Sequence, residues 1–337
     1  MNLRFRTCHL GLVQVNLITN SQAVLDVLGE FYQMVCETDP PLPSWTVEAM
    51  VAPLTSDMAV NHWGVGYLAQ PQSQRIQLHA TDPRHLAITA RKTVREVLID
   101  YCEQRHYIML HASAVADDDR VIVIVGDKGS GKTTIALKSV LSHGMRYLSN
   151  DHLIVYSDMG TSRPTLKLTS LPTPIPLKIG TYLDLECQLP RPWDVEGLEI
   201  DAYRSKDRKD VYGIDRRVLY TFRGLGQQNP VEFDLGDSGT DPSVLVVLAG
   251  YASGGTGRAE IADPVSALMP HVRTDWMFDR NLNQRYLPRC ERGVHEYRAD
   301  AHRLVRKLAA RASVVEWRHR GDPSDLLAPV EREENRS

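Results

Sequence analysis

The sequence contains few of the features that mark secreted, metal-binding or nucleic-acid-binding proteins. It has five cysteines in 337 residues, an odd number without a Cys-x-x-Cys pair. This pattern favours reduced thiols over a disulfide framework or a zinc site. The formal net charge of -3 gives no electrostatic basis for general nucleic-acid binding. Metal-ligand spacing is also missing from the histidines of the C-terminal half, His271, His295, His302 and His319.

Long apolar segments are missing as well. The segment after Arg4 and Arg6 is too polar for a signal peptide or a membrane span. We therefore expect a cytoplasmic protein with no membrane partner. The composition is 42% hydrophobic and 24% charged, which is typical of a globular protein that can bury a core. The length predicts two domains, or one large domain with an appendage.

The most informative segment is a glycine-rich loop at residues 126–133, which reads GDKGSGKT. Residues 120–125 form a β-branched apolar run, which is typical of a buried parallel strand. Residues 134–142 have helical spacing, and Gly144 is a suitable helix end. A strand, a glycine loop, Lys-Thr and a helix, in this order, are the context of a phosphate-binding P-loop. The alternative is a glycine turn that matches the motif by chance, but both flanking segments favour the P-loop.

Each position of this loop has an expected role. The glycines let the backbone approach phosphate oxygens, and the amides of the first helical turn point at the anion. The Lys132 ammonium is expected near the β- and γ-phosphates, and the Thr133 hydroxyl on Mg²⁺. We therefore expect ATP and Mg²⁺ as cofactors, although the loop itself does not distinguish ATP from GTP. The predicted nucleotide-binding residues are Gly126, Asp127, Lys128, Gly129, Ser130, Gly131, Lys132, Thr133 and Thr134.

Phosphoryl transfer also needs a carboxylate near the phosphates, and Asp151 is the best candidate. The usual source is an apolar strand that ends in Asp, but the run at residues 243–249 ends at Gly250. Asp151 follows a short predicted strand at residues 146–149, and a parallel sheet would bring it to the carboxyl edge beside the phosphates. There it would bind Mg²⁺ or accept the proton of an acceptor hydroxyl. The alternative is an aspartate that caps a turn.

Three segments together resemble the core of the HPr kinase/phosphorylase superfamily. They are Leu110-His111-Ala-Ser-Ala-Val115, the P-loop, and Tyr147-Leu-Ser-Asn-Asp151. The similarity spans residues 107–156 and is greatest to the divergent HPr-kinase-like members, which phosphorylate hydroxyls on peptides or small molecules. The family histidine falls on His111. Sequence spacing alone favours a structural role for this residue, and the resemblance assigns it to the active site.

The resemblance implies an α/β fold with a P-loop kinase core of the HPr kinase type, in which helices flank a mixed, largely parallel sheet. We expect this catalytic domain at residues 105–330. A smaller N-terminal α+β domain of unknown role is expected at residues 1–104, and a disordered tail at 331–337. HPr kinases are hexameric, but the sequence carries no readable oligomer signature and leaves a homo-oligomer open.

The chain departs from the family in two places. HPr kinases carry two adjacent aspartates after the strand, whereas Asn150 stands in the first place here and Asp151 in the second. An amide cannot accept a proton, so either Asp151 is the base or catalysis relies on positioning and metal alone. The later Gly-Leu-Gly signature of the family is matched only in part at residues 194–204, where Glu199 replaces the second glycine. Reversible phosphorylase activity is therefore not carried over.

These features predict an ATP-dependent kinase with an alcohol group as acceptor. The expected catalytic residues are Asp151, His111 and Lys132, and the expected metal ligands are Thr133 and Asp151. A Ser or Thr of a peptide or small protein is the first choice of acceptor. A small-molecule alcohol, such as an amino acid, a sugar or a natural-product intermediate, is the alternative. A nucleotide-binding switch or scaffold with slow ATP hydrolysis is a third hypothesis.

The remaining patterns predict further elements around this core. We expect strands at 12–18, 75–79, 107–115 and 314–317, helices at 21–35, 83–104 and 296–312, a proline break at 40–43 and a mobile charged surface loop at 201–217.

Overall fold

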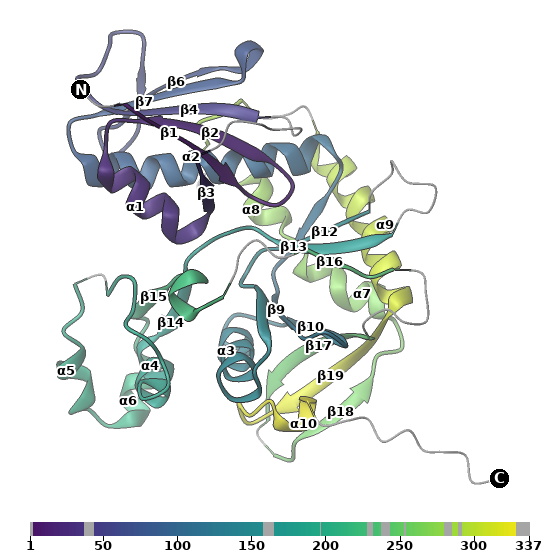
Figure 1. Ribbon diagram of the computed structural model, residues 1–337. Coiled ribbons are helices and arrows are strands. Elements are labelled where there is room, and N and C mark those ends of the chain that lie inside the picture. The colour runs from purple at the N-terminus through teal and green to yellow at the C-terminus, as the bar shows by residue number, and fades with distance from the viewer. Residues whose placement is uncertain are drawn as a thin grey trace.

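The computed structural model describes residues 3–36, 44–157, 165–195, 197–227, 232–236, 243–252, 254–279, 285–288 and 292–327. The protein is α/β, with mixed sheets flanked by helices (Figure 1). The expected proline break at 40–43 and the expected tail at 331–337 lie outside the described residues. In the part of the chain that is described, no helix is both long and apolar enough to span a bilayer.

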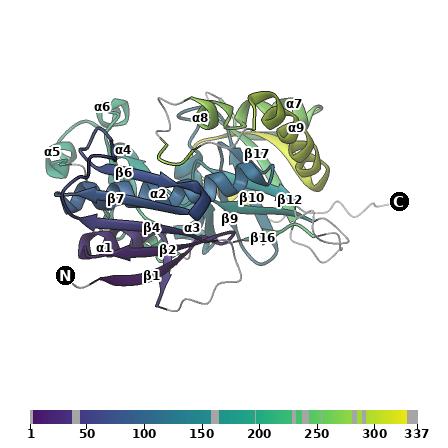
Figure 2. The ribbon, with the colours of Figure 1, turned by 90° about the horizontal axis from the view of Figure 1, so that it is seen from above.

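The first sheet has seven strands in the order β3-β1-β2-β4-β7-β6-β5, and Figure 2 shows its middle strands side by side. Helix α2 packs against α1 and against strands β4 and β7. The N-cap of α2 is Asp82, whose carboxylate accepts the amides of Arg84 and His85. The elements are β1 Arg4–His9, β2 Gln14–Thr19, α1 Gln22–Phe31, β3 Gln33–Val35, β4 Ser44–Val51, β5 Ala59–Val60, β6 Gly66–Gln70, η1 Pro71–Ser73, β7 Arg75–Ala80 and α2 Pro83–Gln104.

The helix expected at 21–35 is shorter than predicted. It ends at Phe31 because Tyr32 adopts an extended conformation, with φ -130° and ψ 145°. The chain then pairs as β3 with the end of β1, and Thr7 lies opposite Val35. The apolar spacing of this segment fits both structures, so periodicity alone did not locate the end of the helix.

The second sheet carries the glycine loop and has the order β11-β9-β10-β17-β19-β18. Among the described residues the sheet is mixed, but it is not the largely parallel sheet that was expected: the β10–β17 and β17–β19 pairs are parallel, and the three other pairs are antiparallel. Because β10 and β11 are both antiparallel to β9, they run in the same direction and their carboxyl ends share one edge. The elements are β9 Ser113–Ala116, β10 Arg120–Val125, α3 Lys132–His143, β11 Arg146–Ser149, β17 Ser243–Tyr251, β18 Gly257–Glu260 and β19 Ala312–His319.

Two chain segments pass from this sheet to a third, four-stranded sheet at the same place. The single strand expected at 107–115 is in fact β8 (Ile108–Leu110) and β9, which belong to different sheets. In the same way, β11 is followed by β12 (Leu153–Ser157), which pairs with β8. The residues at the two junctions, His111 and Asp151, are therefore brought face to face. The third sheet is completed by β13 Leu166–Ser170 and β16 Phe233–Asp234.

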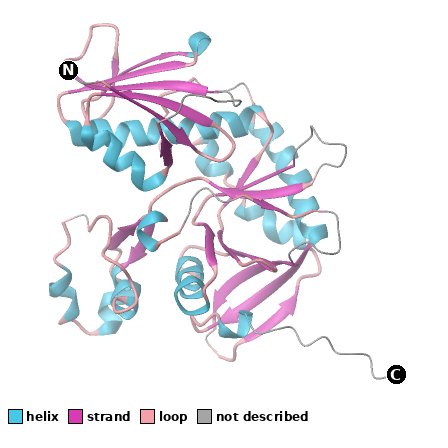
Figure 3. Ribbon diagram, in the orientation of Figure 1, coloured by secondary structure: helices cyan, strands magenta, loops and turns pink. Residues whose placement is uncertain are grey.

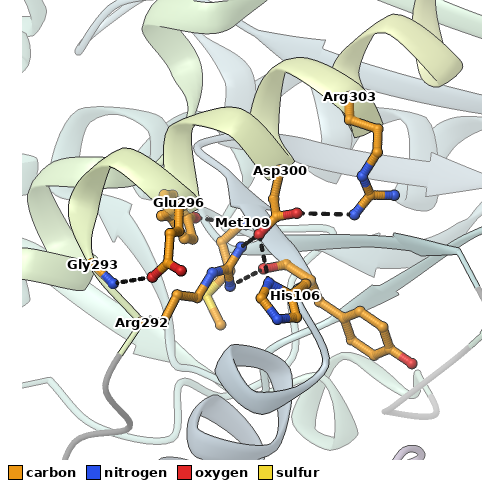
Figure 4. Close-up of polar contacts among 9 residues, drawn as sticks. His106, Met109, Arg292, Gly293, Glu296, Asp300 and Arg303 are labelled. Atoms are coloured by element: carbon orange, nitrogen blue, oxygen red, sulfur yellow. Dashed lines mark hydrogen bonds and ion pairs between the residues drawn. The ribbon is translucent and has the colours of Figure 1, made fainter.

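Helix α9 (Val294–Arg311) fixes the chain that leads to His111. Arg292, just before this helix, donates to Tyr107 O at 2.9 Å and to Asp300 Oδ2 at 2.8 Å. His106 Nδ1 lies 2.8 Å from the same Asp300 oxygen (Figure 4). Tyr297 lies about one turn before Asp300 in α9, and its hydroxyl accepts a hydrogen bond from the amide of Met109 in β8. These bonds anchor β8, and so the junction after it, to α9.

A small unit lies beside α3, built on the two-stranded ribbon of β14 and β15 (Figure 3). The prediction of a mobile loop at 201–217 was wrong, because this segment forms two short helices. Val211 is fully buried, and Asp207 caps the second helix by accepting the amide of Lys209. The unit comprises β14 Ile175–Lys178, α4 Ile179–Leu185, α5 Ile200–Arg204, α6 Arg208–Gly213, β15 Arg217–Tyr220 and η2 Arg223–Leu225, and the other elements are α7 Pro264–Leu268, η3 Met269–His271, α8 Thr274–Phe278 and α10 Ser324–Leu327.

Candidate functional site

The loop between β10 and α3 has the backbone that the P-loop hypothesis requires. Gly126, Gly129 and Gly131 have φ values of 146°, 89° and 88°, which residues other than glycine rarely adopt. A Cβ on Gly126 would lie 2.5 Å from Ala249 O, and a Cβ on Gly131 would lie 2.9 Å from His319 Cε1. The loop is therefore closed tightly against β17 and β19, and glycine is needed at both positions.

The start of α3 is suited to bind an anion. The helix begins at Lys132, so the first amides have no acceptor within the helix. Lys132 Nζ donates to Gly126 O at 2.7 Å and to Asp127 O at 3.1 Å. Burial lowers the pKa of Lys132, and the negative charges of Asp151 and Asp127 oppose this effect. The two loop carbonyls thus hold the Lys132 ammonium beside the loop. Phosphate oxygens would bind this ammonium more strongly than the carbonyls do, because both groups of such a hydrogen bond are charged.

Asp151 and His111 meet at the junction of the two sheets. His111 Nε2 lies 3.5 Å from Asp151 Oδ1, and each side chain is 33% exposed. Asp151 has a positive φ of 64°, a conformation that is costly for residues other than glycine and is often found at functional sites. Burial alone would raise the pKa of Asp151, but the hydrogen bond from His111 and the nearby charge of Lys132 lower it below its usual value. The carboxylate is therefore ionised at neutral pH.

Asn150 binds the hydroxyl that was predicted to hold the metal. Its side-chain oxygen accepts from Thr133 Oγ1 at 3.1 Å and from Tyr147 Oη at 3.0 Å. Asn150 is fully buried, and its Nδ2 has no hydrogen-bond partner in the described part of the chain. Because the Thr133 hydroxyl donates its proton to Asn150, its lone pairs remain available for a cation. Asn150 therefore acts on the site through Thr133 rather than as a base.

The end of β19 supports the loop from the other side. His319 Nδ1 accepts the amide of Gly321 at 2.9 Å, so its Nε2 carries the proton and donates to Ser130 O at 2.9 Å. Burial lowers the pKa of His319, which favours this neutral form. His319 was considered in the sequence only as a metal ligand, and no local motif marks its contact with Ser130.

A single cavity of about 710 Å³ unites these features. Of the predicted residues, it is lined by His111, Asp151 and by Lys128, Gly129, Gly131, Lys132, Thr133 and Thr134 of the loop and helix. Gly126, Asp127 and Ser130 do not line it. Gly126 closes the turn, Asp127 contributes its carbonyl, and Ser130 is buried against His319. The sequence motifs did not identify the rest of the lining, which includes Lys138 of α3, Tyr251 and Arg320 beside the loop, and Lys178, Thr181, Asp184 and Tyr212 of the unit around β14.

The side chains at the site fit magnesium better than a metal held by protein ligands alone. Among the described residues, no group of three or more His, Cys, Asp or Glu side chains is placed to hold a metal ion. Mg²⁺ is usually bound by one or two protein oxygens together with substrate phosphates and water. The Thr133 hydroxyl and the Asp151 carboxylate, which line the same cavity, are such oxygens.

No protein-family model matches the chain, and no curated protein matches its sequence. The similarity to HPr kinases therefore rests on the three motifs and stays a prediction.

Proposed function

We propose that this protein is a Mg·ATP-dependent kinase of the HPr-kinase-like type, which transfers the γ-phosphate to a hydroxyl acceptor. The observation that supports this most is that Lys132 and Thr133 of the loop line the same cavity as the Asp151–His111 pair. A phosphate cradle and an ionised carboxylate facing one cavity are the two parts that phosphoryl transfer to an alcohol needs.

The bound Mg·ATP complex supplies an electrophilic γ-phosphoryl group. The amides at the start of α3 and the Lys132 ammonium would bind the phosphates, and Thr133 would hold the metal. Asp151 would accept the proton of the acceptor hydroxyl as the acceptor oxygen bonds to the γ-phosphorus, and it would also be available as a ligand of Mg²⁺. The bond from this phosphorus to the β–γ bridging oxygen breaks, and ADP leaves. His111 holds Asp151 in position at 3.5 Å.

The low pKa of Asp151 makes it a weak base, and this is compatible with the proposed chemistry. Phosphoryl transfer passes through a loose transition state, in which little proton transfer is needed before the new bond forms. Most of the rate enhancement would therefore come from alignment of the acceptor with the γ-phosphate and from charge neutralisation by Lys132.

The first-choice acceptor is a Ser or Thr of a peptide or small protein, and a small-molecule alcohol is the alternative. A cavity of about 710 Å³ is in the range of sites for drug-sized ligands. The phosphates would fill the part beside the P-loop, and the wall from α4 and β15 would remain for the acceptor.

Two observations favour a second function, a nucleotide-dependent switch or scaffold that hydrolyses ATP slowly. Asn150 replaces a carboxylate of the family pattern, and β17 ends at Tyr251 without an acidic residue. In this case, the rate of ADP release would be the same with and without every acceptor tested. A rate that rises with an acceptor would exclude the switch.

Lys132→Ala is the direct test of the nucleotide site. Calorimetry with Mg²⁺ and a non-hydrolysable ATP analogue should show binding to the wild type and an affinity about 10- to 100-fold lower in the variant, because a charge-assisted contact is lost. Lys206→Ala, on an exposed segment outside the cavity, is the matched control and should bind normally. If folded Lys132→Ala protein transferred phosphate at the wild-type rate, the proposed function would be wrong.

A further inference from the structure

Two cations stand directly opposite each other on the wall of the cavity that faces the P-loop. In the antiparallel pair of β14 and β15, Lys178 is the register partner of Arg217, and both residues line the cavity. Directly opposite residues project from the same face of the ribbon. Like charges in this arrangement destabilise an antiparallel pair, so the pair has a cost in the absence of an anion.

The protein neutralises this pair only in part. Asp215 Oδ1 lies 3.1 Å from Arg217 Nη2, and Asp215 Oδ2 lies 3.7 Å from Lys128 Nζ. Asp215 is exposed and is shared between these two cations. Among the described residues, no carboxylate lies within ion-pair distance of Lys178, and the charge of Asp215 acts on it only from farther away.

The cavity as a whole carries more positive charge than a nucleotide would balance. Its lining has two acidic side chains, Asp151 and Asp184, against six cations, Lys128, Lys132, Lys138, Lys178, Arg217 and Arg320. Magnesium neutralises half of the charge of ATP, and the amides of the P-loop bind phosphate without adding charge. Even with Asp215 included, the cations of the lining outnumber the negative charges that Mg·ATP and these acids supply.

We infer that Lys178 and Arg217 form an anion clamp that binds a carboxylate of the acceptor close to the hydroxyl that is phosphorylated. The inference rests on the proposed function and narrows its acceptor to hydroxyl compounds with a nearby carboxylate. Arg217 offers a planar fork that matches a carboxylate, and Lys178 adds a point charge beside it. The clamp belongs to the small unit of β14 and β15, whereas the phosphates are bound by the loop and α3. The Oγ1 atoms of Thr134 in α3 and Thr181 in α4 lie 3.5 Å apart, so the surface proposed for the phosphates and the surface proposed for the acceptor are adjacent.

The test compares acceptors that differ only in the carboxylate. One pair is N-acetyl-L-serine and N-acetyl-L-serinamide, which represents a free hydroxy acid. The other pair is the blocked peptides Glu-Ser-Glu and Gln-Ser-Gln, which represents an acidic protein segment. Calorimetry measures the affinity of each compound for the wild type, Lys178→Met, Arg217→Met and the control Lys206→Met, with the protein saturated by Mg²⁺ and a non-hydrolysable ATP analogue.

We expect at least one acid to bind the wild type about tenfold or more tightly than its amide, since a charge-assisted contact contributes at least 1.4 kcal/mol. Both clamp variants should lose this preference, and Lys206→Met should keep it. The pair with the larger preference identifies the source of the carboxylate. Equal binding of acid and amide in both pairs would overturn the inference, and so would a preference that persists in the clamp variants.

The affinity for the nucleotide analogue separates this inference from its alternatives. It should change less than about twofold in Lys178→Met and Arg217→Met, because these residues bind the acceptor. A fall as large as the loss of acid preference would assign the pair to the nucleotide and overturn the inference. Preference for the acid without any phosphate transfer by the wild type would contradict the proposed function but leave the clamp in place.

Discussion

His111 Nε2 lies 3.5 Å from Asp151 Oδ1, although the two residues belong to different strand connections. The distance is a consequence of topology, because β8–β9 and β11–β12 cross from one sheet to another at the same point. The pair lines the cavity of the glycine loop. In the proposed kinase, this pair is the chemical centre of the site.

Asp151→Asn should lower kcat for phosphate transfer by about 10²-fold, the lower end of the usual effect of losing a general base, because a loose transition state needs little proton transfer. The size and shape of the side chain are kept, so binding of the nucleotide analogue should change little. Steady-state kinetics with the acceptor that the wild type uses would measure the effect. Asp118→Asn is a suitable control, because Asp118 is 91% exposed at the turn before β10. Wild-type kcat in Asp151→Asn would remove Asp151 from the mechanism.

Because Thr133 Oγ1 donates a hydrogen bond to Asn150 Oδ1, we expect Asn150→Ala and Asn150→Asp to differ in their Mg²⁺ dependence. Asn150→Ala leaves the hydroxyls of Thr133 and Tyr147 without their acceptor, at a cost of about 1–3 kcal/mol in the free energy of unfolding. It should also raise the Mg²⁺ concentration needed for half-maximal activity, because Thr133 is no longer oriented. Asn150→Asp keeps an oxygen for both hydroxyls and should keep the Mg²⁺ dependence. A Mg²⁺ titration that is the same in Asn150→Ala and the wild type would show that Asn150 does not position Thr133.

Substitution of Gly126 by Ala should damage the loop more than the same change elsewhere. A Cβ at this position would lie 2.5 Å from Ala249 O, a backbone atom that cannot move aside cheaply. Binding of Mg²⁺ and the ATP analogue should therefore be lost or strongly weakened. Gly144→Ala is the matched control, since Gly144 has φ 68° but no atom within 4 Å of the added Cβ. It should cost about 1 kcal/mol in stability and leave nucleotide binding intact. Equal nucleotide affinity in both variants would contradict this description of the loop.

Two buried groups give opposite dependences of stability on pH. Burial, helped by the charge of Arg273, lowers the pKa of His152 to about 3 from the ordinary 6.5. Its neutral form therefore stabilises the fold fully above pH 6.5, and this contribution is lost as the pH falls toward 3. Burial raises the pKa of Glu96 to about 7 from 4.5, although the hydrogen bonds that its carboxylate accepts from the amides of Tyr286 and Leu287 oppose this shift. Its contribution is full below pH 4.5 and is lost as the pH rises toward 7.

Between pH 4.5 and 6.5 the two effects oppose each other, so single variants reveal them. His152→Phe should lower the slope of unfolding free energy against pH by about 1.4 kcal/mol per unit, and Glu96→Gln should raise it by a similar amount. Urea denaturation at several pH values measures both slopes. Slopes that change in the same direction in the two variants would show that one of the pKa directions is wrong.

Local sequence signals were sufficient where one short segment determines the structure. The strand before the glycine loop, the helix that ends at Gly144 and the extent of α2 were all predicted from neighbouring residues. The same is true of β19 and α9 within a few residues. At these places the hydrophobic pattern and the capping residues agree with each other, so the local signal is unambiguous.

Features that depend on distant contacts were not predictable in this way. The apolar run at 107–115 gives no sign that it changes sheets at His111, because both halves are equally apolar. The charged segment at 201–217 forms helices because a few residues, such as Val211, reach the buried cluster around Tyr182. The contact of His319 with Ser130 and the pairing of Lys178 with Arg217 join segments far apart in the chain. Without related sequences, no local pattern marks such contacts.

Mass spectrometry of candidate acceptors after incubation with the protein and Mg·ATP tests the central claim most directly. Transfer of the γ-phosphate adds one HPO₃ unit, a gain of about 80 Da on a hydroxyl, and fragmentation locates it. The account predicts this gain with wild-type protein and its absence with folded Lys132→Ala protein. A gain that persists in Lys132→Ala would contradict the account, and so would ADP formation by the wild type without a mass gain on any acceptor, whether peptide or small molecule.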